Sequence, residues 1–433
     1  MRLFAVPEPH GHPLTLNLAL TIQPQAKPSM MYKPSRKHPA YSGALALFLL
    51  FFAPFETAAQ DVAQLDVDAL ESRVADLFER SCARVGCHAA PVPQQGMDLS
   101  REVFYASIVD EPSQEKPDLK RVHPGRPDLS YLLMKVNGDP EIEGVQMPLA
   151  GDKLTEEEID TIEAWISKLT EVDPARKAAQ PAVAYPFAGW KVVNLPTTRT
   201  LDAGSFFFLI SHRFVPPVNI GYEGLYGLDG SGVIFLNFGY APTDKLLLVL
   251  GRSNASDDVE LWARYRVAQQ NRETRWPLSV GVQTSLNWIT EGDDAFKFTA
   301  QAPLTRQLTD GLGIGVVPGI LFNADEGTEG EDPLITVGLG GRWTFWRNVS
   351  LVGEWVPIVS GYTETFTVGT FNRFDSWNGG LEIATSGHVF QIVAGNAVGL
   401  ATDHYLRGGD LDPRDFFDGE FRLGFNIFRV LNF

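Results

Sequence analysis

The residues in this chain with the clearest potential for chemistry lie in the stretch ERSCARVGCHAA, residues 79–90. It contains both cysteines of the 433-residue chain, Cys82 and Cys87, and His88 directly follows the second thiol. Two thiols can add across the vinyl groups at the edge of a haem, and a histidine next to the second thiol then lies under the iron. Four residues separate the cysteines, where the usual motif has two. The stretch predicts covalent attachment of haem c through both thiols, with His88 as an iron ligand.

Two other interpretations of the same residues stay open. In an oxidising periplasm Cys82 and Cys87 can form a small disulfide loop, which leaves His88 as a surface residue. A zinc site would need two further converging ligands, and His123 is the nearby candidate. The disulfide is the stronger of these two alternatives because it needs no other residue.

A second axial ligand of the iron is predicted at Met147, in the sequence GVQMPLAG that precedes a helical stretch. The thioether of methionine is a common partner of histidine on a haem iron. His123, in the proline-rich segment between the cysteines and Met147, competes for this role.

Two amphipathic helices flank these residues and must position them. Apolar residues recur at helical spacing before Cys82, and Asp68 with Glu71 forms a predicted capping box. These apolar residues are Leu70, Val74, Leu77 and Phe78. The second helix lies in LTEEEIDTIEAWISKL, and Thr155 and Glu158 are its predicted caps. Its apolar face comprises Ile159, Ile162, Trp165, Ile166 and Leu169.

The order of these motifs resembles a variant of the c-type cytochrome domain that is fused to large bacterial proteins. After the CxxxxCH motif come GMDLS at 96–100, HPGRPDLSYL at 123–132, Met147-Pro148 and Trp165-Ile166. The resemblance covers residues 65–170. It implies a small all-α domain, haem iron as cofactor, electron transfer, and redox partner proteins in the periplasm or envelope.

The N-terminus carries a predicted export signal. A basic segment from Arg36 precedes the apolar run GALALFLLFFAPF, and the small residues Thr57, Ala58 and Ala59 predict cleavage after Ala59. The apolar run is short for a bilayer span, although a retained membrane anchor stays the alternative. Residues 1–59 are therefore expected to be an N-terminal extension and signal peptide.

Residues 187–433 have the alternation of a membrane β-barrel. In DVELWARYRVAQQ, Trp262, Arg264 and Arg266 alternate with Leu261, Ala263, Tyr265 and Val267. Many predicted strands are near the length that a tilted strand needs to cross a bilayer. The chain ends on Phe433, which is similar to the last strand of outer-membrane barrels. A secreted β-sandwich would also alternate and is the alternative fold.

The segment KVVNLPTTRTLDAG, followed by ISHRF, resembles a bacterial family of barrels without an assigned activity that are found beside such cytochrome domains. The sequence as a whole predicts two domains. An all-α c-type cytochrome domain at 60–170 precedes a linker at 171–186 and an all-β antiparallel barrel of about 12 strands at 187–433.

Composition and these motifs together predict the function. A net charge of −17 argues against nucleic acid as a partner. The predicted protein is a non-enzymatic electron carrier whose periplasmic haem domain is tethered to a barrel in outer-membrane lipid. The alternative is a non-redox envelope protein with a disulfide-bearing module and a solute-binding or porin-like barrel.

Overall fold

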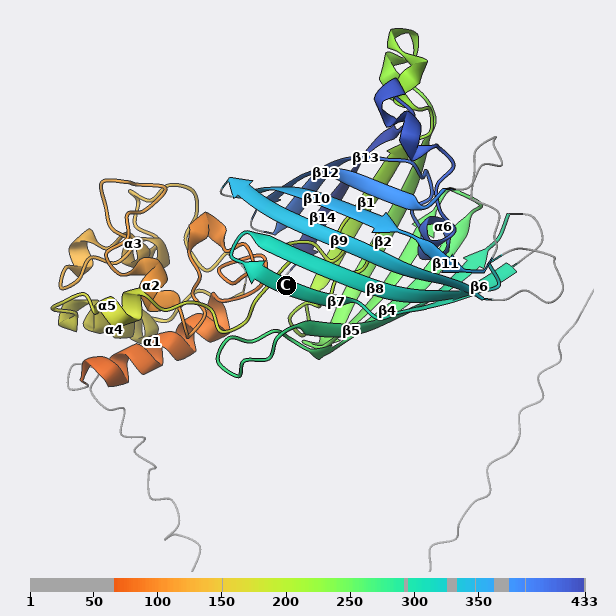
Figure 1. The fold of residues 1–433 in the computed structure, drawn as a ribbon. Coiled ribbons are helices and arrows are strands. Elements are labelled where there is room, and N and C mark those ends of the chain that lie inside the picture. Colours follow the sequence, from red (N-terminus) through yellow and green to blue (C-terminus); the bar gives the residue numbers. More distant parts are fainter. Residues whose placement is uncertain are drawn as a thin grey trace, which may run out of the picture. The chain divides into compact units, whose positions relative to one another are not determined.

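The computed structural model describes residues 66–149, 151–291, 295–324, 333–346, 348–361, 374–385 and 387–431. The expected signal peptide and the terminal Phe433 lie outside these residues. The described chain begins with a helical module and continues into a β-barrel (Figure 1).

In the described part of the chain, none of the helices is long and apolar enough to cross a membrane.

The helical module packs its helices around one apolar core. All four apolar residues predicted for the first helix are buried there, together with Ile162, Trp165 and Ile166 of the second. The ring N–H of Trp165 donates to Glu71 at 3.1 Å, which joins the two helices across the core. The helices of the module are α1 (Val67–Ser81), α2 (Phe104–Ile108), α3 (Tyr131–Asn137), α4 (Glu156–Lys168) and α5 (Pro174–Lys177).

The helix caps agree with the sequence prediction at α4 and differ at α1. Thr155 and Glu158 form a capping box, as predicted. At α1 the cap is Asp66, whose carboxylate accepts from the backbone N–H of Ala69 at 2.8 Å. The predicted box of Asp68 and Glu71 is wrong because the N-cap lies two residues earlier, at Asp66, and Glu71 accepts from Trp165 instead.

The stretch predicted as a linker, 171–186, contains the short helix α5. Asp173 caps this helix. Lys177 donates to the carbonyl oxygens of Ala106 and Val109 at 3.0 and 2.9 Å and pairs with Glu111. The first part of this stretch therefore packs on the helical module.

The strands close into a twelve-membered antiparallel ring, as predicted. β1 and β14 pair from Phe206↔Leu431 to Arg213↔Gly424, which joins the first strand to the last. β6 and β7 occupy one position in the ring, as do β10 and β11. The strands are β1 (Phe206–Phe214), β2 (Gly232–Thr243), β3 (Leu246–Ser253), β4 (Asp258–Ala268), β5 (Ser279–Ile289), β6 (Ala295–Gln301), β7 (Leu304–Thr309), β8 (Leu312–Phe322), β9 (Leu334–Trp346), β10 (Val349–Val356), β11 (Ile358–Ser360), β12 (Ser376–Thr385), β13 (His388–Gly395) and β14 (Arg422–Leu431).

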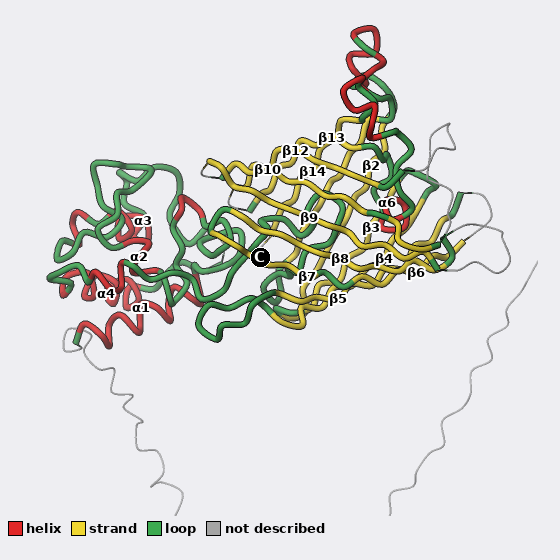
Figure 2. Tube along the Cα trace, in the orientation of Figure 1, coloured by secondary structure: helices red, strands yellow, loops and turns green. Residues whose placement is uncertain are grey.

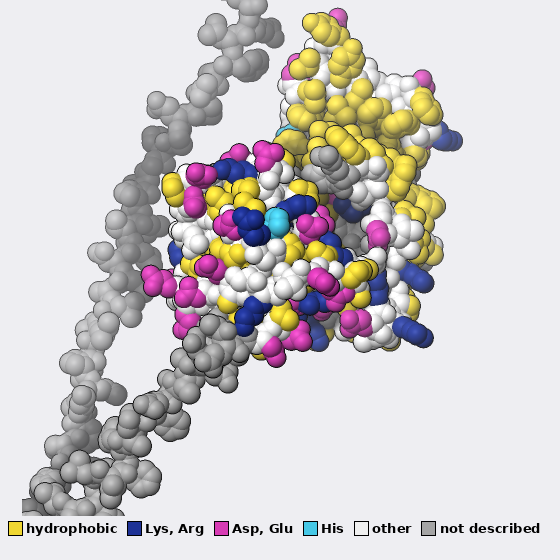
Figure 3. Space-filling model, turned by 90° about the vertical axis from the view of Figure 1, so that its left-hand side faces the viewer, with side chains coloured by type: hydrophobic (Ala, Val, Ile, Leu, Met, Phe, Trp, Pro, Cys, Tyr) yellow, Lys and Arg dark blue, Asp and Glu magenta, His cyan; other side chains and the backbone are white. Residues whose placement is uncertain are grey.

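The barrel wall is apolar outside and polar inside. In β4 the side chains of Leu261 and Tyr265 are 56% and 48% exposed, whereas Trp262 and Arg264 are buried in the lumen. Figure 3 shows hydrophobic side chains gathered on the barrel and on the segment that projects between β1 and β2. A soluble barrel or sandwich would have the reverse pattern, so this wall fits a hydrocarbon environment.

The lumen is filled by chain that is not part of the wall. Residues 186–201 are all buried, although none of them belongs to a strand. A second internal segment, 395–406, is also buried and contains the short helix α6 (Thr402–Leu406). Figure 2 shows such loop segments against the strands of the barrel. The first residues of the predicted barrel domain thus form an internal segment.

Candidate functional site

The helical module encloses a cavity of about 560 Å³, within the usual size of small-molecule and cofactor sites. Cys82, Cys87, His88 and Met147 all line it. The fold thus brings together the two cysteines predicted to attach haem and the two residues predicted as iron ligands, His88 and Met147.

The cysteine loop is built on the end of α1. The N–H of Cys82 donates to the carbonyl of Phe78 at 2.8 Å, and the N–H of His88 donates to the carbonyl of Cys82 at 3.2 Å. Gly86 has a φ of +85°, a left-handed conformation that suits glycine and lets the loop turn back. No disulfide joins Cys82 and Cys87 in this structure. The loop therefore holds the two thiols and the imidazole against one wall of the cavity.

His88 is held as a neutral imidazole. Its Nδ1 lies 3.3 Å from the carbonyl oxygen of Met97, which orients the ring. Burial lowers the pKa of His88 below its usual value; the hydrogen bond to Met97 acts in the opposite direction. Neutral imidazole is the form that ligates a metal ion, so the ring is suited to this role at neutral pH.

The thiol of Cys82 is held in its protonated form. Burial raises the pKa of Cys82 to about 12, and the neighbouring Cys87 adds to the increase. Arg80 acts against the shift. The side chain therefore behaves as an uncharged group in this cavity at neutral pH.

The loop that contains Met147 is fixed from both sides. The N–H of Met147 donates to the carbonyl of Lys135 at 2.9 Å, and Lys153 Nζ donates to the carbonyl of Gln146 at 2.8 Å. The competing ligand, His123, places its Nδ1 3.1 Å from the carbonyl oxygen of Pro124. His123 is not among the described residues that line the cavity. The geometry therefore favours Met147 over His123.

Apolar side chains from α1, from α3 and from the loops that precede α2 and α4 complete the cavity walls. They are Phe78, Leu99, Leu132, Val136 and Leu154. The basic residues Arg84, Arg121, Lys135 and Lys153 also line the cavity. Lys135 pairs with Glu115, and Arg121 and Lys153 donate to backbone carbonyls. Sequence reasoning did not place these apolar and basic residues at the cavity. The apolar run SYLLMKV was the available signal for the wall formed by α3.

A family model described as "Membrane bound beta barrel domain (DUF5777)" matches residues 187–431. The chain belongs to this family. Its members are defined by the barrel, which agrees with the closed ring and the apolar outer wall. Family membership and fold support the predicted location of the barrel in an outer membrane. They also exclude the secreted sandwich that the strand pattern left open.

Solved structures with a similar barrel are distant. An outer membrane channel from Pseudomonas putida F1 is 15% identical, with a TM-score of 0.35, and the match covers 54% of this chain and 98% of that one. The NanC porin is 9% identical, with a TM-score of 0.34 and coverages of 52% and 98%. The KdgM porin in complex with disordered oligogalacturonate is 10% identical, with a TM-score of 0.31 and coverages of 53% and 99%. No curated protein matches the chain.

Proposed function

We propose that this chain is a membrane-anchored electron carrier, in which the helical module holds a c-type haem and the barrel fixes it to the outer membrane. The observation that supports the proposal most strongly is the convergence of Cys82, Cys87, His88 and Met147 on one cavity. Cys82, Cys87 and His88 are close in the sequence, whereas Met147 lies 59 residues after His88 and is brought to them by the fold. The volume and apolar walls of the cavity suit a porphyrin.

Each of the four residues has a distinct role in this proposal. Cys82 and Cys87 would hold the porphyrin through thioether bonds, and His88 and Met147 would supply a nitrogen and a sulfur donor to the iron. When bound, the haem supplies a one-electron iron couple. The neutral thioether of Met147 favours the reduced iron and raises the potential. The apolar walls limit the access of water to the site and raise the potential further.

The partners in this proposal are redox proteins in the periplasm or envelope, together with outer-membrane lipid around the barrel. A single haem in the helical module cannot span a bilayer. The barrel is therefore proposed as an anchor, and any transfer of electrons across the membrane would need further proteins.

The visible absorption spectrum of the purified full-length chain, oxidised and reduced, tests this proposal. The protein should be produced in a host that matures c-type cytochromes. We expect sharp absorption bands to appear on reduction. These bands should be lost in a variant that combines Cys82→Ser, Cys87→Ser and His88→Ala. A colourless protein, with both thiols accounted for by mass spectrometry, would contradict it.

A second candidate is a non-redox envelope protein whose barrel binds or passes small solutes. Membership in the membrane barrel family and a lumen rich in polar side chains favour it. The internal segments 186–201 and 395–406 fill this lumen, so passage would require one of them to move. Conductance of the purified chain in a planar bilayer tests this candidate. Stable open-channel currents would support it, and their absence across a range of voltages would count against it.

A further inference from the structure

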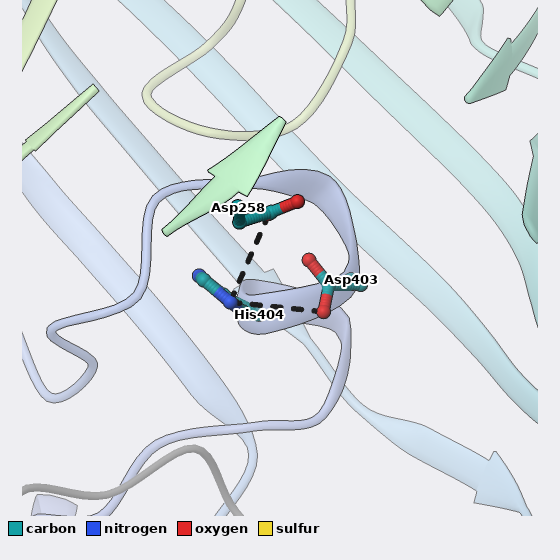
Figure 4. Close-up of side chains that lie close together, drawn as sticks. All are labelled: Asp258, Asp403 and His404. Atoms are coloured by element: carbon teal, nitrogen blue, oxygen red, sulfur yellow. Dashed lines mark ion pairs between the residues drawn. The ribbon is translucent and has the colours of Figure 1, made fainter. Parts of the chain in front are cut away.

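We propose a binding site for a divalent transition-metal ion inside the barrel, formed by Asp258 of β4 with Asp403 and His404 of α6. One ligand atom from each of these residues lies within 4.8 Å of the others. His404 Nε2 is 3.9 Å from Asp258 Oδ2 and 3.7 Å from Asp403 Oδ2. The three side chains point toward one another from a wall strand and the internal helix (Figure 4). All three are buried.

Three of the four carboxylate oxygens of Asp258 and Asp403 lack a hydrogen-bond donor in the described part of the chain. Among the described residues, Asp258 Oδ1 and both carboxylate oxygens of Asp403 are buried without a hydrogen-bond partner. Burying an ionised oxygen without a donor or a cation is costly, and such groups in native proteins usually have an ion or a water beside them. A bound cation would account for three such atoms in one place.

Glu260 gives an independent indication of a ligand. It is two residues from Asp258 on the same lumen-facing side of β4, and it is also buried. Its Oε2 lies 3.4 Å from the N–H of Thr402, the residue before Asp403, while Oε1 is buried without a hydrogen-bond partner. Glu260 therefore adds a fourth buried carboxylate oxygen without a hydrogen-bond partner beside α6.

Two basic side chains, those of Lys297 and Arg407, form long ion pairs with Asp403. Lys297 Nζ and Arg407 Nη2 lie 3.9 and 3.6 Å from Asp403 Oδ2. Both distances exceed those of N–H···O hydrogen bonds, and Lys297 directs a hydrogen bond of 3.1 Å to the carbonyl of Ala324. These side chains offset part of the negative charge, but neither donates a hydrogen bond to the carboxylate oxygens of Asp403.

The ligand set favours a zinc-like ion. One imidazole nitrogen with carboxylate oxygens suits Zn²⁺ or a neighbouring first-row ion better than Ca²⁺, which takes oxygen ligands alone. Ligand atoms in a tetrahedral zinc site lie about 3.4 Å apart. The observed 3.7 and 3.9 Å thus require the side chains to close by a few tenths of an ångström. Asp258 is already oriented by Asn287, whose Nδ2 donates to Oδ2 at 2.9 Å.

A cation at this position would tie the internal segment 395–406 to the barrel wall. The ligands are fully buried, so the ion would enter while the barrel folds, before α6 is seated. The site would then act as a structural clamp on the segment that fills this part of the lumen.

Metal content after refolding tests the proposal. The full chain with Cys82→Ser and Cys87→Ser, which removes the thiols as zinc ligands, is refolded in detergent with Zn²⁺ and dialysed against a weak chelator. We expect about one zinc per chain by mass spectrometry of the metal. Asp403→Asn and Asp258→Asn should each lower the retained zinc per chain at least about tenfold, since each removes a charged ligand. Asp418→Asn, an exposed acid after the internal segment, is the matched control and should retain the zinc.

Two results would overturn the site: a parent chain that retains no zinc, or ligand variants that retain as much as the control. Heat-dependent gel mobility identifies the variants that fold. If a ligand variant does not fold, Co²⁺ bound to the parent chain decides the question. The strong visible bands of a four-coordinate ion, displaced by Zn²⁺, would support the site, and the weak spectrum of a six-coordinate surface ion would overturn it.

Discussion

Arg264 Nη1 donates to the carbonyl oxygen of Trp190 at 2.8 Å, which joins the wall strand β4 to the internal segment 186–201. The same nitrogen donates to the carbonyl of Arg199 at 3.0 Å. On the other side of the lumen, Glu354 of β10 accepts from consecutive N–H groups, including that of Asn194 at 2.9 Å. The internal segment has no strand or helix to satisfy its backbone, so the wall side chains do this instead.

The first prediction concerns this segment. Glu354 accepts from the N–H groups of Val193, Asn194 and Leu195 at 2.9–3.0 Å. Glu354→Ala leaves these groups without an acceptor, so the free energy of unfolding should fall by about 2–4 kcal/mol. Channel conductance in a planar bilayer should rise as the segment loosens. Glu291→Ala, at an exposed position, is the control. Unchanged stability and conductance in Glu354→Ala would show that the segment is held by other contacts.

The second prediction concerns barrel closure. β14 pairs with both β13 and β1, so deletion of residues 424–433 removes two ladders and opens the ring. The truncated chain should be degraded or accumulate in the periplasm because exposed strand edges cannot be satisfied in lipid. The intact chain should stay with the outer membrane in high salt, and its gel mobility should shift on boiling. Recovery of residues 187–433 as a monodisperse soluble protein without detergent would contradict this prediction.

The third prediction concerns the pH dependence of the helical module without haem. Burial lowers the pKa of His88, so its contribution to stability is present above pH about 6.5 and is lost as the pH falls toward the folded pKa. Burial raises the pKa of Cys82 to about 12, so its contribution is present below the unfolded pKa and is lost as the pH rises toward 12. The helical module should be most resistant to urea between these pH limits, with its unfolding followed by the fluorescence of Trp165. In His88→Gln the loss of stability at acidic pH should be smaller. If that loss is unchanged, another titrating group causes it.

The fourth prediction concerns the second axial ligand. Met147→Ala should remove the weak sulfur-to-iron band of the oxidised protein and lower the midpoint potential, because a soft neutral donor is lost. His123→Ala is the matched control, since His123 does not line the cavity. It should leave both the band and the potential unchanged. The reverse outcome, with the band sensitive to His123 alone, would reassign the ligand.

The barrel could be predicted from the sequence because its signal is local. In β4 the alternation of Trp262 and Arg264 with Leu261 and Tyr265 is a direct consequence of strand geometry, and it places these residues on opposite faces as predicted. The capping box of Thr155 and Glu158 has the same local character. The approximate number and length of the strands could also be read from the sequence, whereas the ring closes through the pairing of β1 with β14.

The filling of the lumen and the cluster of Asp258, Asp403 and His404 could not be predicted in this way. Residues 186–201 have no hydrophobic period, and their burial depends on side chains such as Glu354 and Arg264 that lie far along the chain. Asp258 and His404 come from a strand and a helix that the topology alone brings together. The adjacent Asp403-His404 pair was the only local signal, and a lone pair of this kind is common on protein surfaces. Cys82, Cys87, His88 and Met147, which line the cavity, were singled out because their order along the chain resembles a known domain, and their role as a haem site stays a prediction.

Covalent retention of haem is the most direct test of the central proposal. The purified full-length chain is denatured, extracted with acidic acetone and analysed by mass spectrometry and by haem staining on a gel. The proposal predicts that the polypeptide keeps its colour and carries the mass of one haem on the peptide that contains Cys82 and Cys87. A colourless polypeptide of unmodified mass, or one that differs only by an internal disulfide between these cysteines, would contradict it.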